Sequence, residues 1–205
     1  MLGVLPKHEN KGIAFRLKME QKKFALQYGY RVVKWTFDPL LSKNAYLNLK
    51  KLGAILRTYV ENIYGNLHDQ FNRGLPTDRF VVEWFVEESA QKAISDRKLQ
   101  VNDSVCVESA VFNTLEKANF RIPGKSRFTK LPRIVSLEIP YDFLHIKKTS
   151  LSVSRQWRKV TRKNFVDLFR KGYVAFDFRS IDFGKEKRSF YLLERNPHWL
   201  KYCRY

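Results

Sequence analysis

The stretch that decides the fold runs from Leu2 to Ala14 and reads LGVLPKHENKGIA. Its apolar start, Leu2 to Leu5, predicts a short buried strand that leaves a sheet. A polar turn follows, and a helix is expected to begin at once at Gly12. The first N–H groups of a helix have no internal partner and its dipole end is positive, so a diphosphate would bind there. Gly12 and the small Ala14 would let a phosphate approach the backbone, and Lys11 would add a point charge.

Outward from this stretch, the first 90 residues predict an α/β order. We expect a helix over 12–28 and another over 41–52, and strands over 30–37, 55–64 and 79–86. This order implies at least one parallel crossover. In the first helix, a stripe at spacings of four and seven residues is expected to face the core. The stripe consists of Ile13, Leu17, Phe24 and Tyr28.

The remainder, 91–205, predicts an additional C-terminal α+β region that packs on the first region, 1–90. We expect helices over 90–98 and 153–170, a helical turn over 141–146, and strands over 104–112, 134–139, 173–178 and 189–193. Nothing in the composition marks a linker between the two regions.

The composition of the chain is strongly basic. Its 205 residues include 39 Lys and Arg against 20 Asp and Glu, which gives a formal net charge of +19. Such a charge suits nucleic acid, a polyanionic cofactor such as coenzyme A, or solubility alone. The densest basic stretches, among them 147–163, are interpreted as solvated helix faces. We expect no membrane span and no signal peptide, and the two distant cysteines favour a cytoplasmic location.

Two sets of residues resemble the GNAT family of acyl-CoA N-acyltransferases. Val4 to Pro6, followed by Glu9 to Ala14, is similar to the family's acyl-CoA motif, a strand ending V-x-P and then Gln/Arg-x-x-Gly-x-Gly/Ala. Glu9 stands where the family prefers Gln or Arg. The blocks WTFDPL, NAYLNLKKLGA, YVENIYG and NRGLPTDRFVVEW resemble, in this order, one poorly characterised GNAT subgroup. Some members of that subgroup are associated with N-succinyl amino acid racemases.

The resemblance implies a GNAT-like mixed sheet flanked by helices, truncated at its N-terminus. It implies transfer of an acyl group from acetyl-CoA, or from another acyl-CoA such as succinyl-CoA, to the amine of a small molecule such as an amino acid. The expected cofactor-binding residues are Leu2, Gly3, Val4, Glu9, Asn10, Lys11, Gly12, Ile13, Ala14 and Asn44. Asp38 and Tyr46 are the catalytic candidates, and Glu61 and Glu83 are further candidates for the base.

Two alternatives stay open at this point. Cations interleaved with aromatic residues, as in SRQWRKVTRKNF (154–165) and NPHWLKYCRY (196–205), are compatible with a basic nucleic-acid-binding protein. An inactive remnant of an acyltransferase is the other alternative. A homodimer is one option for the oligomeric state.

Overall fold

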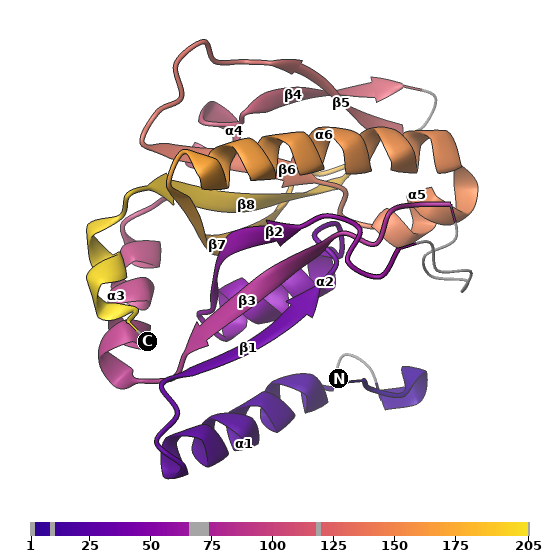
Figure 1. Ribbon diagram of the computed structural model, residues 1–205. Coiled ribbons are helices and arrows are strands. Elements are labelled where there is room, and N and C mark those ends of the chain that lie inside the picture. Colours follow the sequence, from indigo (N-terminus) through magenta and orange to yellow (C-terminus); the bar gives the residue numbers. More distant parts are fainter. Residues whose placement is uncertain (1–2, 9–10, 66–73, 118–119, 205) are drawn as a thin grey trace.

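The computed structural model describes residues 3–8, 11–65, 74–117 and 120–204 (Figure 1). The strands are β1 (Val32–Phe37), β2 (Ile55–Val60), β3 (Arg79–Phe85), β4 (Phe112–Lys117), β5 (Phe120–Ser126), β6 (Ile134–Ile139), β7 (Tyr173–Asp182) and β8 (Lys187–Arg195). The α-helices are α1 (Ile13–Gln27), α2 (Ser42–Ala45), α3 (Glu88–Leu99), α4 (Val105–Glu108), α5 (Phe143–Thr149) and α6 (Leu151–Arg170). Two 3₁₀ segments, η1 (Pro6–His8) and η3 (His198–Tyr202), and a π-helix, η2 (Tyr46–Lys51), complete the described elements.

One six-stranded sheet, in the order β1-β3-β2-β7-β8-β6, is the centre of this α+β fold, and β4 and β5 form a separate hairpin. The expected mixed sheet is wrong, because every pair of neighbouring strands among the described residues is antiparallel. The strands β1 and β2 nevertheless run in the same direction, since β3 lies between them and is antiparallel to both. The connection through α2 is therefore a crossover without a parallel ladder.

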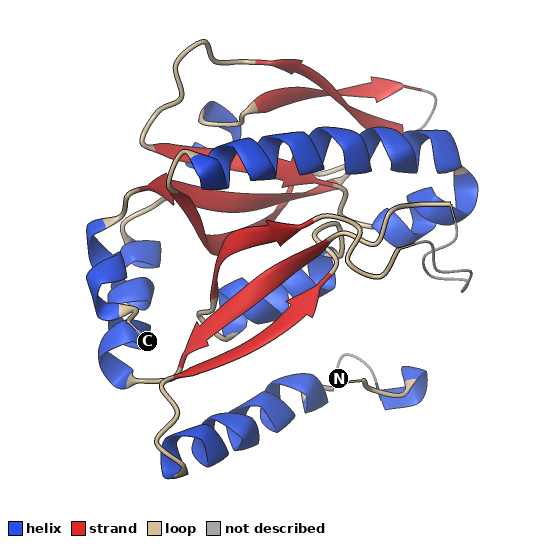
Figure 2. Ribbon diagram, in the orientation of Figure 1, coloured by secondary structure: helices blue, strands red, loops and turns tan. Residues whose placement is uncertain are grey.

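Residues from both halves of the chain build this sheet. The strands β1, β3 and β2 come from the first 90 residues, and β2 pairs with β7 of the second half through Leu56 and Ala175. Figure 2 shows the strands in red at the centre, with the long helix α6 across them. No described helix is long and apolar enough to cross a membrane.

The two faces of the sheet bury separate sets of apolar side chains. On one face, Trp157, Phe165 and Leu168 of α6 join a buried cluster that includes Phe80 and Tyr191. The ring of Phe165 lies 4.7 Å from that of Phe80 and 5.2 Å from that of Tyr191, in edge-to-face geometry. The other face is covered by α3 and η3 through side chains such as Ile94 and Trp199. The alternation of the strands therefore fills two layers, as period-two patterns require.

The helix α6 is positioned by its buried stripe and its cap. Its buried residues are Ser154, Trp157, Arg158, Thr161, Phe165 and Leu168, at the spacing of one helical face. The hydroxyl of Ser150 accepts a hydrogen bond from the amide of Val153, as an N-cap residue does. The expected helix over 153–170 is confirmed, with its start two residues earlier.

The expected orientation of α1 is wrong, although its bounds, Ile13–Gln27, agree within one residue with the expected helix over 12–28. Leu17, Phe24 and Tyr28 are exposed, whereas Lys18 and Ala25 are buried. The contact with β1 explains this orientation. The Lys18 ammonium lies 3.3 Å from the centre of the Trp35 ring, so the helix face that carries Lys18 packs against the sheet. Burial lowers the pKa of Lys18 to about 8.

The expected strand over 104–112 is also wrong. Residues 105–108 form the short helix α4, and β4 begins only at Phe112. The amides of Cys106 and Val107 donate to the carbonyls of Asp103 and Ser104, which closes a helical turn in place of a ladder. Over so short a run, alternating apolar residues do not distinguish a strand from a helical turn that buries one side chain. In α4 that side chain is Cys106.

Replacing Phe165 should test the core beneath α6. Phe165→Ala removes a fully buried ring, and we expect it to lower the free energy of unfolding by about 3–5 kcal/mol. Leu99→Ala is the matched control, because Leu99 is 84% exposed. Urea denaturation of both variants measures the difference, and equal losses for the two would contradict this packing.

The buried ammonium of Lys18 should make stability depend on pH. Its pKa is about 8 in the folded chain against 10.5 ordinarily, so the unfolded chain holds more protons between these values. The free energy of unfolding contributed by Lys18 therefore rises with pH across this window. Relative to Lys18→Met, the wild type should gain stability from pH 8 to pH 10.5 in urea denaturation. Lys163→Met, at an exposed position of α6, should show no such trend, and a flat difference for Lys18→Met would contradict the buried ammonium.

Candidate functional site

The residues expected to bind a cofactor lie at the start of α1 and in the segment before it. Leu2, Glu9 and Asn10 lie outside the described residues. Gly3 and Val4 belong to no strand, so the expected strand over 2–5 is wrong for the part that the structure describes. A short apolar run forms a strand only when a neighbour pairs with it and covers it, and Leu5 is 64% exposed.

Gly12 is the N-cap residue of α1, close to the expected start of this helix. Gly12 has a left-handed backbone with φ of 73°, and among the described residues no heavy atom beyond its chain neighbours and the backbone of α1 lies within 4 Å of the position that a Cβ would occupy. The amide of Arg16 donates to the carbonyl of Gly12 at 3.0 Å, which leaves the amides before it without intrahelical partners. The first turn carries no acidic residue. Lys11 is exposed, and Ile13 and Ala14 are half-buried.

Asp38 lies directly after β1 and is held in contacts of its own. One carboxylate oxygen accepts from the Nη2 of Arg158 at 2.6 Å, and the other accepts from the amide of Leu40 at 2.9 Å. Arg79 lies 3.9 Å from the first oxygen. The carboxylate therefore acts as a turn and ion-pair group in this structure, and a proton transfer to it would compete with the charge of Arg158.

The other candidates from the sequence lie apart from this ion pair or are paired within the sheet. Tyr46 is 39% exposed in η2, with the Lys51 ammonium 5.7 Å from its ring, and Asn44 is exposed in α2. Glu83 is buried in β3, 2.8 Å from Arg57. Glu61 accepts from Arg162 at 3.0 Å.

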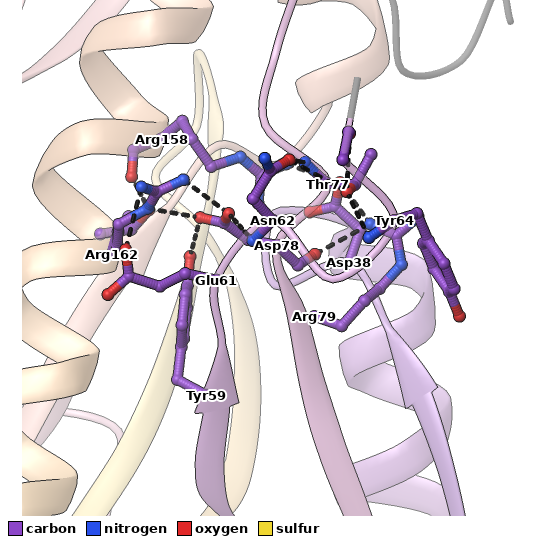
Figure 3. Close-up of polar contacts among 12 residues, drawn as sticks. Asp38, Tyr59, Glu61, Asn62, Tyr64, Thr77, Asp78, Arg79, Arg158 and Arg162 are labelled. Atoms are coloured by element: carbon purple, nitrogen blue, oxygen red, sulfur yellow. Dashed lines mark hydrogen bonds and ion pairs between the residues drawn. The ribbon is translucent and has the colours of Figure 1, made fainter. Parts of the chain in front are cut away.

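A second carboxylate, Asp78, lies at the centre of a polar cluster that sequence reasoning missed (Figure 3). It is fully buried where β3 begins, and it accepts from the Nε and Nη2 of Arg162 at 2.8 and 2.6 Å. The hydroxyl of Tyr59 donates to it at 2.6 Å. The amide of Asn62 donates to it at 3.0 Å. These bonds satisfy the carboxylate and join α6 to the ends of β2 and β3.

The surroundings of this cluster keep its two arginines charged and its tyrosine neutral. Burial lowers the pKa of Arg158, but Asp38, together with Tyr59 and Asp78, raises it above its ordinary value. Burial likewise lowers the pKa of Arg162, and the hydrogen-bonded Asp78 raises it. Burial raises the pKa of Tyr59 well above its ordinary range, so its hydroxyl keeps the proton that it donates to Asp78.

A cavity of about 330 Å³ lies beside this cluster, between α6 and the residues before β3. It is lined by Gly74, Pro76, Arg155, Arg158, Lys159 and Arg162. Arg158 is only 2% exposed, and its Nε and Nη1 have no hydrogen-bond partner in the described part of the chain. We name these six residues the arginine pocket.

The interpretation of the basic stretch 147–163 as a solvated face is wrong for Arg158. The signal that could have found the pocket is the spacing of Arg155, Arg158, Lys159 and Arg162, since positions three, four and seven residues apart share one helical face. The sequence could not show that this face packs against Asp38 and Asp78. Asp38 lies 120 positions from Arg158, and Asp78 lies 84 positions from Arg162. Within the described ranges, no group of three or more His, Cys, Asp and Glu side chains could hold a metal ion.

Comparison with known proteins gives no relative. No protein-family model matches the chain, and no curated protein or solved structure is significantly similar to it.

The buried position of Asp78 predicts a large loss of stability on replacement. Asp78→Asn removes the charge that balances Arg162, and breaking such a buried pair costs about 3–5 kcal/mol. Glu61→Gln is the matched control, since this partner of the same arginine has a side chain that is 52% exposed. We expect it to cost under about 1 kcal/mol. Denaturation midpoints that fall equally in both variants would contradict the central position of Asp78.

Proposed function

We propose that the chain binds an acyl-coenzyme A at the start of α1 and transfers its acyl group to the amine of a small molecule. The observation that carries the proposal is the start of this helix of 15 residues at Gly12. A left-handed glycine with open space above it lets a phosphate reach first-turn amides that have no intrahelical partners. The cations Lys7, Lys11 and Arg16 lie close to this start in the sequence, are exposed and match a diphosphate in sign.

The position of α1 relative to the sheet adds support. The strand β1 is the last strand on its side of the sheet, so its outer edge has no strand partner among the described residues. Figure 1 shows α1 near this edge, with its start on the side where β1 ends. Unpaired backbone groups along an edge strand are hydrogen-bond partners for an extended chain such as a pantetheine arm.

The transfer step follows the general chemistry of thioesters. The amine nitrogen attacks the thioester carbonyl and forms the new C–N bond, and the amine proton passes to a carboxylate or to water. The C–S bond breaks as the sulfur is protonated and leaves as a thiol. Tyr46, with an exposed side chain, is the proposed proton donor to the sulfur. Asp38 can accept the amine proton only in competition with its ion pair to Arg158.

A second candidate function, binding to a nucleic-acid backbone, is favoured by one observation. Arg155, Lys159 and Lys163 are exposed along one side of α6, each four residues after the one before. A row of cations on a helix attracts the phosphates of a nucleic acid without reading its sequence.

The thermal midpoint of the protein with acetyl-CoA and succinyl-CoA tests the proposed site. Excess ligand at about 100 times its dissociation constant should stabilise the fold by roughly 2.7 kcal/mol. Gly12→Glu should abolish the shift, because it adds a carboxylate where the phosphate would bind. Gly184→Glu is the matched control, since Gly184 also has a left-handed backbone, with φ of 82°, and open space around it. No shift in the wild type, or equal loss in both variants, would contradict the proposal.

A further inference from the structure

Among the described residues, the arginine pocket presents four cations and no acidic side chain to one cavity. Arg155, Arg158, Lys159 and Arg162 come from successive turns of α6, and Gly74 and Pro76 close the opposite side. A volume of about 330 Å³ is at the lower end of the range for cavities that hold small molecules. This part of the molecule is independent of the start of α1.

Two of the four cations are not neutralised by the carboxylates nearby. Arg158 pairs with Asp38, and Arg162 pairs with Asp78 and Glu61. Arg155 donates from Nε to the carbonyl of Gly74 at 3.2 Å. In the described part of the chain, neither Arg155 nor Lys159 forms an ion pair. The pocket therefore has two positive charges for which a ligand with two negative charges is the matching partner.

The deepest of the four cations has unused donors. The contact with Asp38 uses only the Nη2 of Arg158, and its Nε and Nη1 are buried without a partner among the described residues. A buried donor without a partner costs about 1–3 kcal/mol, and more on a charged group. An acceptor oxygen in the neighbouring space, from water or from an anion, would offset this cost. Anionic oxygens are the strongest acceptors for a guanidinium.

We propose that the arginine pocket binds a small dianion, the phosphate group of a phosphorylated small molecule or free phosphate. Arg158 lies at its base and adds its positive charge beneath the ligand. Arg155 and Lys159 supply the two charges at the exposed rim, and Arg162 is shared with Asp78. The phosphate group carries up to two charges and three or four acceptor oxygens, which suits donors that converge from several side chains.

Calorimetric titration of the full chain with inorganic phosphate tests this site, with glycerol 3-phosphate in a second arm. The buffer holds ionic strength constant with chloride, because general screening would otherwise imitate binding. We expect saturable binding, and the double variant Arg155→Gln/Lys159→Gln should weaken it roughly tenfold or more as two charge-assisted contacts are lost. Both positions are exposed, so the double variant should keep its fold. Tighter binding of glycerol 3-phosphate would assign an organic phosphate as the ligand, and equal binding would assign free phosphate.

Lys163→Gln is the matched control, since Lys163 is exposed on α6 but does not line the pocket. It should bind phosphate like the wild type. In Gly12→Glu, the phosphate binding that the double variant weakens should persist, which separates this site from the start of α1. The absence of saturable heat in the wild type would overturn the proposal. Equal weakening in Lys163→Gln and in the double variant would also overturn it. If both Lys163→Gln and the double variant also bind a single-stranded oligonucleotide equally weakly, and this binding falls with salt, α6 would instead contact the phosphate backbone of nucleic acids without sequence specificity.

Discussion

The buried ion pair between Arg158 and Asp38 is the constraint on which the arrangement of this molecule depends. It joins the middle of α6 to the end of β1, across 120 positions of sequence. A guanidinium with a side chain only 3% exposed is tolerated only when a carboxylate compensates for its lost hydration. Arg162 and Asp78 repeat this arrangement one turn further along the helix. Together the two pairs fix α6 over the sheet edge where β1 ends and β3 begins.

The same constraint links structure to the proposed chemistry. Asp38 and Asp78 are paired with arginines. The region where β1 ends and β3 begins therefore favours the binding of anions over proton abstraction. Both proposed sites, the start of α1 and the arginine pocket, depend on positive groups with donors to spare. Part of the net charge of +19 lies at these two proposed sites. The net charge alone could not locate them.

Much of the fold could be predicted from the sequence because its periodic segments are long. The helix α6 and the strands β3, β6 and β8 follow from apolar spacing and their turn residues. The order of strands could not be predicted, since it depends on β3 inserting between β1 and β2. The burial of Lys18 reversed the expected face of α1, because an ammonium over the Trp35 ring occupies the place that a hydrophobic stripe was expected to take. For the candidate site, Gly12 was visible as a helix start, whereas Arg158 required a contact with a distant carboxylate.

A double-mutant cycle between Arg158 and Asp38 tests this account most directly. Arg158→Met, Asp38→Asn and the double variant are compared with the wild type in the free energy of unfolding by urea. The account predicts a coupling energy of at least about 1.5 kcal/mol, because Asp38→Asn leaves the buried guanidinium of Arg158 without its carboxylate. A coupling energy below about 0.5 kcal/mol, with additive losses, would mean that α6 is held over the sheet by apolar packing alone.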